Sequence, residues 1–324
     1  MNEKKVLWWC WPDCASLFSM TLSNRRSLGV LLMAGASLCW SLSGIIVRNT
    51  SVTNNWEVVF WRSCFSFIFL ACWLGITHGR DSVAEFRRIG KVGAISGLMF
   101  ATMITFFLLA LTLTTVANTQ AIVCLAPFSA AIAAWVVLRE KLSMRTWIAM
   151  IGALLGVALM FVESLGTGRM IGNLVALFVP IAYGINVAIL RKSHAQGDMV
   201  MAVLIGSFFS ALLTLPLAWP FQAAGHDLAL LALMGVLQLA IGCILFVRAM
   251  PYLTAVEISL IGLLESILAP LWVWVGVGER PSNLALIGGA IVIVSLVLNE
   301  LMGARRKHFD RASAATSIVP PGAI

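Results

Sequence analysis

Four charged side chains interrupt long apolar runs of this sequence, and one of them is placed to do proton chemistry. Glu265 lies at the middle of the run 254–277. A charged group at that depth of a membrane costs about 2.5–3.5 kcal/mol, so it must face a partner or water. Removal from water disfavours the ionised form of a carboxyl group, which lets it bind and release a proton near neutral pH. We therefore predict that Glu265 binds a coupling proton or the amine of a substrate; the alternative is a protonated acid that joins two helices.

The other three charges are Arg62, Arg248 and Glu257. Arg62 lies about one helical turn inside the run 58–77, where a guanidinium can bind a substrate carboxylate or phosphate or neutralise Glu265. It can also extend to the membrane surface, which better explains Arg248 at the end of its run. Glu257 lies in the first turn of its run, where a carboxylate stabilises a helix N-terminus. It also lies about 80° around a helix from Glu265, so both acids could line one pathway.

Uncharged polar side chains in other apolar runs are candidates to line the same pathway. Tyr183 and Asn186 are three positions apart, and therefore share one face of a helix. The alternative for each candidate is a hydrogen bond between helices, which contributes about 0.6 kcal/mol on average. Besides Glu265, Arg62 and Glu257, the predicted site consists of Trp40, Asn118, Gln120, Tyr183 and Asn186.

The composition indicates which kind of protein must position these residues. Of the 324 residues, 60% are hydrophobic and 11% are charged, and the mean hydropathy is +0.95. Soluble domains are about 25% charged, so a soluble fold is excluded, and so is a disordered chain. The formal net charge of +8 is better explained by membrane topology than by nucleic-acid binding. None of the seven cysteines has the C-x-x-C spacing of a metal or redox site, so no metal and no cofactor is predicted.

Ten apolar stretches are long enough to cross a bilayer as helices of about 20 residues. They predict an all-α membrane protein, because a helix satisfies its own backbone hydrogen bonds in lipid. With the N-terminus in the cytoplasm, most lysines and arginines fall on the inner side and only Arg48, Arg169 and Arg280 on the outer side. This asymmetry predicts that both termini are cytoplasmic. The stretches are 28–47, 58–77, 93–112, 116–138, 146–162, 171–190, 199–219, 229–249, 254–277 and 283–299.

The second half of the sequence repeats the first. Residues 254–279 align without a gap with residues 115–140, and a weaker match places Trp40 over Tyr183. Each half contains five stretches, and because five is odd the two halves enter the membrane from opposite sides. Such inverted repeats are typical of secondary transporters, in which two equivalent halves alternate around a central site. Duplication can also build membrane proteins of other function. Aligned pairs include Thr115/Thr254, Glu140/Glu279 and Arg48/Arg191.

These observations divide the chain into four parts. Translation can start at Met1 or at Met20, and the sequence leaves this open. The C-terminal tail is basic at first and then rich in Ser, Ala and Pro, so we expect it to lack regular structure. The parts are a cytoplasmic N-terminal segment (1–27), a first five-helix repeat (28–163), a second five-helix repeat (167–302) and a cytoplasmic tail (303–324).

The sequence resembles the drug/metabolite transporter superfamily, and within it the bacterial EamA-type permeases. The resemblance covers about 28–302 and depends on the ten stretches, the inverted halves, Arg62, and the ends LRE and LLES…APLWVWVGVGERPS of the fourth and ninth stretches. It implies a central cavity lined by spans one to four and six to nine, with spans five and ten outside. It also implies a multi-pass protein of the bacterial inner membrane that moves amino acids, metabolites or drugs, mostly outward.

The predicted function is therefore a secondary transporter that exports a small polar metabolite, amino acid or drug-like compound by alternating access, with proton coupling left open. The predicted partners are a small-molecule substrate and the lipid bilayer, with protons left open, and no nucleic acid. Gly152 and Gly156 form a patch of small residues that can pack on another helix or another subunit, which leaves a homodimer open.

The alternative is an intramembrane enzyme that acts on a lipid or lipid-linked substrate. Against it, the ten stretches contain no histidine, and no HExxH motif occurs. A membrane scaffold or sensor would need a soluble domain, and the hydrophilic segments are short. We therefore predict that the protein is not an enzyme. The histidines, His78, His194, His226 and His308, all fall in predicted loops or the tail.

Overall fold

The computed structural model describes residues 22–78, 81–139, 142–164, 168–192 and 199–316. Every regular element within these ranges is a helix, and ten helical segments are long and apolar enough to cross a membrane. Each of the ten overlaps one predicted stretch, so the prediction of an all-α protein with ten spans is confirmed. The segments are Arg25–Arg48, Asn55–Thr77, Val92–Leu113, Val116–Leu138, Met144–Val162, Met170–Lys192, Val200–Ala218, Gly225–Tyr252, Glu257–Val277 and Asn283–Met302.

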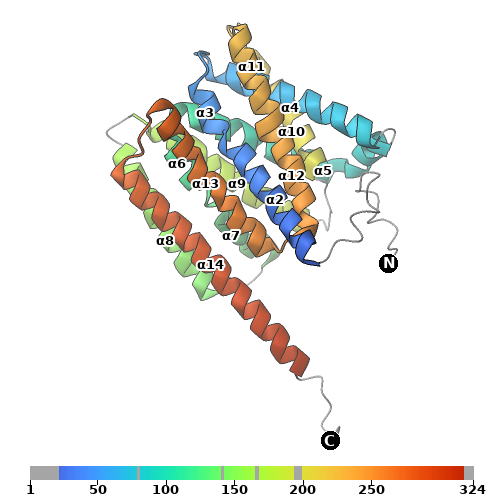
Figure 1. Ribbon diagram of the computed structural model, residues 1–324, viewed down its shortest axis with the longest axis vertical. Coiled ribbons are helices and arrows are strands. Elements are labelled where there is room, and N and C mark those ends of the chain that lie inside the picture. Colours follow the sequence, from blue (N-terminus) through green and yellow to red (C-terminus); the bar gives the residue numbers. More distant parts are fainter. Residues whose placement is uncertain (1–21, 79–80, 140–141, 165–167, 193–198, 317–324) are drawn as a thin grey trace, which may run out of the picture.

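The two halves follow each other along the chain (Figure 1). The first half contains α2 (Leu22–Ser41), α3 (Ser43–Arg48), α4 (Asn55–His78), α5 (Asp81–Leu113), α6 (Val116–Val123), α7 (Ala126–Leu138) and α8 (Met144–Ser164). The second half contains α9 (Met170–Lys192), α10 (Met199–Ala218), α11 (Gly225–Leu233), the π-helix η3 (Met234–Ile241), α12 (Gly242–Ala249), the short 3-10 helix η4 (Met250–Tyr252), α13 (Ala255–Val277) and α14 (Asn283–Thr316).

Three spans are irregular in their middle. The first span is broken at Leu42, between α2 and α3, and the fourth at Cys124 and Leu125, between α6 and α7. Pro127, at the start of α7, has no backbone N–H to donate and is therefore tolerated after such a break. The eighth span changes from α-helix to the π-helix η3 and back. Irregular backbone at membrane depth occurs where protein or a cavity surrounds it, and π-helical turns are frequent at functional sites.

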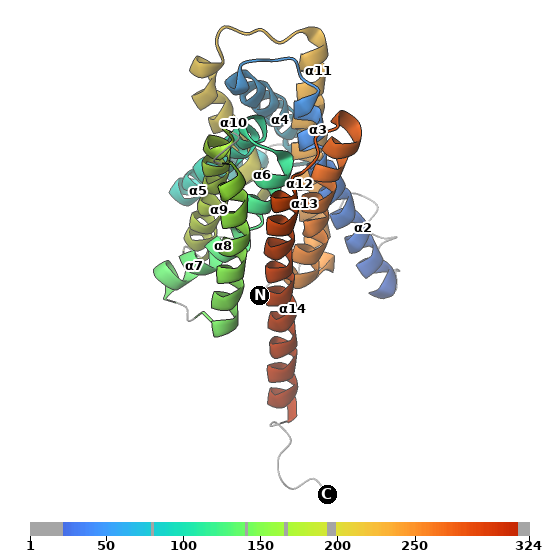
Figure 2. The same cartoon turned by 90° about the vertical axis from the view of Figure 1, so that its left-hand side faces the viewer.

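Packing between the halves has the symmetry expected of an inverted repeat. The first span of the first half, α2, packs on α12 and α13, and the first span of the second half, α9, packs correspondingly on α5 and α7. Exchange of the halves therefore maps one set of contacts onto the other. Figures 1 and 2 show α8 and α14, the last spans of the two halves, side by side at the edge of the bundle.

Local structure repeats as well. Thr115 and Thr254 are both extended residues that cap the N-terminus of a helix, at φ −72°, ψ 151° and φ −75°, ψ 156°. Their hydroxyl groups accept hydrogen bonds from the backbone N–H groups of Asn118 and Glu257, at 3.2 and 3.3 Å. A threonine at this position satisfies one of the free N–H groups of the first turn. The aligned threonines thus cap equivalent helices in the two halves.

Small residues hold α8 and α14 together. A Cβ atom on Gly156 would lie 2.6 Å from the carbonyl oxygen of Gly288, and one on Gly152 would lie 2.7 Å from the hydroxyl of Ser295. Only glycine permits so close an approach of two helices. The patch formed by Gly152 and Gly156 is therefore used within the chain and does not supply a surface for a second copy.

Two parts of the chain differ from expectation. The expectation that the tail lacks regular structure from residue 303 is wrong, because α14 continues to Thr316. Alanine and arginine favour helix, and extension of an existing helix avoids the cost of nucleation. His226, expected in a loop, lies in the first turn of α11, since the eighth span begins at Gly225.

Candidate functional site

Arg62 is buried at the centre of the bundle without a direct ionic partner. It lies on α4, and its residue surface is only 2% exposed. Its Nη2 group donates a hydrogen bond to Oε1 of Gln238 at 3.0 Å, and Nη1 donates to the carbonyl oxygen of Ile104 at 3.3 Å. Its Nε atom is buried and has no hydrogen-bond partner. Burial of a charge with neutral partners is costly, and the guanidinium is enclosed by protein and does not extend to the surface.

Glu265 lies on α13 and points into the bundle. Its carboxylate oxygen Oε1 accepts a hydrogen bond from Nε2 of Gln120, on α6, at 3.3 Å. Its neighbours Leu264 and Ile267 are exposed, whereas Glu265 is half-buried. The charges of Glu265 and Arg62 lie close enough to interact. No nitrogen–oxygen pair of these two described residues lies within 4.0 Å.

The π-helix η3 brings the eighth span into contact with both Arg62 and Trp40. A Cβ atom on Gly235 would lie 2.5 Å from the backbone oxygen of Arg62, and one on Gly242 would lie 2.6 Å from Nε1 of Trp40. Gln238 lies between these two glycines and is buried. The wider turn of a π-helix and the two glycines together place its amide against the guanidinium. Gln238 is not among the predicted site residues, although it is the only amide side chain in the run 229–249.

Asn118 belongs to a neighbouring polar cluster. Its Nδ2 group donates to Oδ1 of Asn173 at 3.4 Å, and Thr114 donates to the same oxygen at 2.7 Å. Asn173 lies on α9, so this cluster joins the fourth span to the sixth. Asn118 is therefore engaged in a contact between helices, which is the alternative considered for it.

Tyr183 and Asn186 lie on α9, where the chain is held against α7. Asn186 is buried, and its side-chain oxygen has no hydrogen-bond partner. Ser129 of α7 donates a hydrogen bond to the carbonyl oxygen of Pro180, and Gly184 permits close contact with the Ser129 backbone. No hydrogen bond between described residues joins Tyr183 or Asn186 to the group formed by Arg62 and Glu265.

Glu257 lies at the N-terminus of α13, away from Glu265. It forms a capping box with Thr254, and its Oε1 lies 2.5 Å from Nη2 of Arg26. Both contacts stabilise a helix end. Arg248 is exposed at the end of α12, in the position expected for a residue that extends to the membrane surface.

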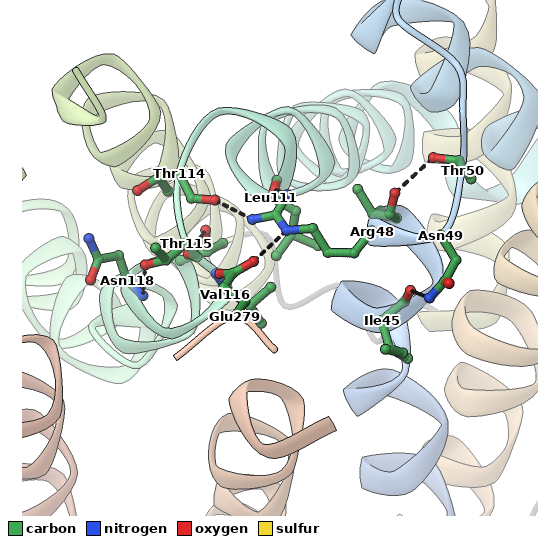
Figure 3. A network of polar contacts seen from close by, with 12 residues as sticks. Ile45, Arg48, Asn49, Thr50, Leu111, Thr114, Thr115, Val116, Asn118 and Glu279 are labelled. Atoms are coloured by element: carbon green, nitrogen blue, oxygen red, sulfur yellow. Dashed lines mark hydrogen bonds and ion pairs between the residues drawn. The ribbon is translucent and has the colours of Figure 1, made fainter. Parts of the chain in front are cut away.

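A second ionic site, absent from the predicted set, lies at the end of the bundle where α3 and α13 both end (Figure 3). Nε of Arg48 donates to Oε2 of Glu279 at 2.6 Å, and Nη1 and Nη2 donate to the carbonyl oxygens of Leu111 and Thr114 at 2.7 and 2.8 Å. The other carboxylate oxygen of Glu279 accepts from the backbone N–H of Val116 at 3.1 Å. We name these five residues the Arg48–Glu279 junction.

The signal that points to this junction is the repeat alignment. It pairs Arg48 with Arg191 and Glu279 with Glu140. Each half therefore has an arginine at the end of its first span and a glutamate at the end of its fourth span. Glu140 lies outside the described residues.

Comparisons with known proteins agree with this architecture. The model of the EamA-like transporter family matches residues 27–162 and 170–301. One solved crystal structure aligns with a TM-score of 0.57 and 18% sequence identity, over 86% of this chain and 98% of its own length, which shows a shared fold. No curated protein gave a match. The family model covers both halves of the chain, so the chain belongs to the EamA-like transporter family and is a transporter of the drug/metabolite type.

Proposed function

We propose that this transporter exports a small polar compound across the bacterial inner membrane by alternating access, in exchange for protons that bind Glu265. The observation that carries the proposal is a reciprocal arrangement across the two halves. Arg62 of the first half is hydrogen-bonded to Gln238 of the second, and Glu265 of the second half is hydrogen-bonded to Gln120 of the first. A change in either charge therefore acts on the contact between the halves, which alternating access must rearrange.

Competition for one carboxylate supplies the exchange. Glu265 can hold a proton or the amine of a substrate, and the two exclude each other at the same oxygens. Arg62, with its unpartnered Nε, offers a donor for a carboxylate or another acceptor on the same substrate. A substrate that carries an amine and an acceptor therefore fits both groups. Proton entry displaces the amine and releases the substrate on the side from which the proton comes.

The proposed orientation rests on the basic residues. The start of α2 and the end of α14 lie at the same end of the bundle (Figure 1), and Arg25, Arg26, Arg191 and Lys192 belong to helix ends on that side. We propose that this end faces the cytoplasm, as the positive-inside rule requires. The Arg48–Glu279 junction then faces the outer side.

The experiment that tests the function uses inverted membrane vesicles that hold a proton gradient. A panel of amines, amino acids and drug-like compounds is added, and a fluorescent probe reports loss of the gradient. We expect a subset of compounds to release protons only when the transporter is present. Glu265→Gln should abolish this response because an amide cannot release a proton.

The matched control is Glu257→Gln, which changes an acid on the same helix at its exposed N-terminus. It should leave the response in place. Normal proton release by the Glu265→Gln protein would refute the coupling role, and a panel without any transporter-dependent flux, with or without a gradient, would refute the export of a small polar compound.

A further inference from the structure

The Arg48–Glu279 junction joins four segments that are distant in the sequence. Arg48 is the last residue of α3, and Val116 begins α6. Leu111 lies in the last turn of α5, Thr114 follows that helix directly, and Glu279 follows α13. Each of the three guanidinium nitrogens donates one hydrogen bond within the junction, and both carboxylate oxygens accept one. Figure 3 shows the arginine reaching from α3 toward the end of α13 and the start of α6. A contact this complete fixes the relative positions of all four segments.

We propose that the Arg48–Glu279 junction is a reversible lock that closes the transporter at this end, and that its release opens the path from Arg62 and Glu265 to the outside. The proposal rests on the proposed function, since it assigns a regulated opening to the same site. It differs in that it concerns access to the site and not what binds there.

The segments that the lock holds are built to move. α3 has six residues and α6 has eight, and each is separated from the rest of its span by a break. Neither the residue before α3, Leu42, nor the residue before α7, Leu125, makes a side-chain cap. At both breaks the backbone keeps helical angles, and the N–H groups of Ile46 and Ser129 still donate to the carbonyl oxygens of Leu42 and Leu125. Each short helix is therefore joined to the rest of its span through one irregular turn, the kind of discontinuity that transporters use.

The lock is also connected to the charged site. α6 begins at Val116, whose N–H is held by Glu279, and one turn further it carries Gln120, which is held by Glu265. At the other break, Ser41 at the end of α2 accepts a hydrogen bond from Nε1 of Trp272 at 2.9 Å. Movement of α6 therefore changes the contact to Glu265, and a change at Glu265 acts back on α6.

The solvent exposure of the pair suits a contact that must break. The side chains of Arg48 and Glu279 are 23% and 22% exposed, so water can replace their mutual contact as it opens. A fully buried pair would leave two charges without solvent when separated, and would resist opening.

The opposite end of the bundle has an ionic contact of its own between the first and ninth spans. Arg26 and Glu257 join the start of α2 to the start of α13, so an arginine–glutamate pair links the first and ninth spans at each end. Among the described residues, no hydrogen bond or ion pair joins α13 to α7 at that end.

The test uses Cys124, which lies in the break between α6 and α7 and is buried against Ser266. A membrane-impermeant maleimide reports its access from the outside in right-side-out vesicles and from the cytoplasm in inverted vesicles. We expect Arg48→Gln to raise the outside labelling rate at least about fivefold, the lower range for two coupled states. Glu279→Gln should do the same. The protein carries Cys124 as its single cysteine, with alanine at Cys10, Cys14, Cys39, Cys64, Cys72 and Cys243.

The double variant decides whether the two residues act as one contact. If they do, Arg48→Gln with Glu279→Gln labels no faster than either single variant. The matched control is Arg280→Gln, which removes an exposed arginine at the same end and should label like the parent. Single variants that label at the parent rate from both sides, or a double variant whose effects multiply, would overturn the lock.

The readout needs neither a substrate nor a proton gradient, so it fails separately from the proposed function. A rise in labelling from the cytoplasmic side would support the lock and overturn the proposed orientation. Should Arg48→Gln not fold, Arg48→Lys keeps the charge beside Glu279 and loses the forked contact to Leu111 and Thr114. We expect it to label at a rate between parent and Glu279→Gln.

Discussion

Gln238 accepts a hydrogen bond from the buried guanidinium of Arg62 at 3.0 Å, across the boundary between the two halves. Replacement by leucine fills the space but leaves Nη2 buried without an acceptor, which costs about 1–3 kcal/mol. We therefore expect Gln238→Leu to lower the melting temperature in detergent and to impair transport. Gln238→Glu should restore the melting temperature through a charged acceptor, yet impair transport because it neutralises Arg62. Unchanged melting and flux in the leucine variant would contradict this role.

Arg62 and Arg248 provide a second comparison. Arg62→Ala removes a donor that we place at the substrate, and loss of one partner from a buried, hydrogen-bonded charged contact costs about 2–5 kcal/mol. Flux of a compound found in the vesicle screen should fall by more than about tenfold. Arg248→Ala changes an exposed side chain at the end of α12 and should have little effect. Equal, mild losses in both variants would favour a surface role for each.

Two glycines with opposite surroundings test the packing around Arg62. A Cβ atom on Gly235 would meet the Arg62 backbone oxygen at 2.5 Å, whereas nothing lies within 4 Å of one on Gly75 of α4. Gly235→Ala should lower the free energy of unfolding by about 1–3 kcal/mol. Gly75→Ala should raise it by about 0.5–1 kcal/mol, because alanine loses less backbone entropy in a helix. Thermal unfolding in detergent measures both, and equal shifts would rule out the close contact.

Reporter fusions test the orientation independently of transport. A reporter active only in the cytoplasm should work in the segment 78–92, and one active only outside should work in the segment 163–170. The positive-inside rule predicts this pattern from the basic residues Arg80, Arg87, Arg88 and Lys91. As a control, the reporter that is active only in the cytoplasm should also work when it is fused to the C-terminus. The reverse pattern would turn the whole chain over and place the Arg48–Glu279 junction in the cytoplasm.

The spans and the repeat were accessible from sequence because they depend on local hydrophobicity. A run of apolar residues long enough to cross a bilayer can be recognised from the sequence alone. An acid within such a run can be recognised as well, because the free-energy cost of placing Glu265 in the membrane requires a partner. Arg62 and Glu265 were predicted for that reason, whereas Gln120 was predicted as an uncharged polar residue and donates a hydrogen bond to Glu265. The position of Gln238 could not be predicted from the sequence, because the π-helix that places it depends on packing against Arg62 and Trp40.

The Arg48–Glu279 junction was missed for a different reason. Charged residues at span ends normally set topology or contact water, and nothing in their own segment distinguishes these two. Their contact depends on how the ends of α3, α5, α6 and α13 come together, which is a tertiary property. Tyr183 and Asn186 lie on α9, and no hydrogen bond between described residues joins them to Arg62 or Glu265, so their place in the site stays a prediction.

The contact between Arg62 of the first half and Gln238 of the second has a consequence for biosynthesis. Arg62 and its acceptor Gln238 are 176 positions apart, so the arginine enters the bilayer while most of the second half has still to be translated. During that interval the translocation machinery, lipid head groups or temporary neighbours must shield it. Fragments of one half, produced alone, would carry either an orphan guanidinium or an orphan acid, and we expect quality-control proteases to remove them.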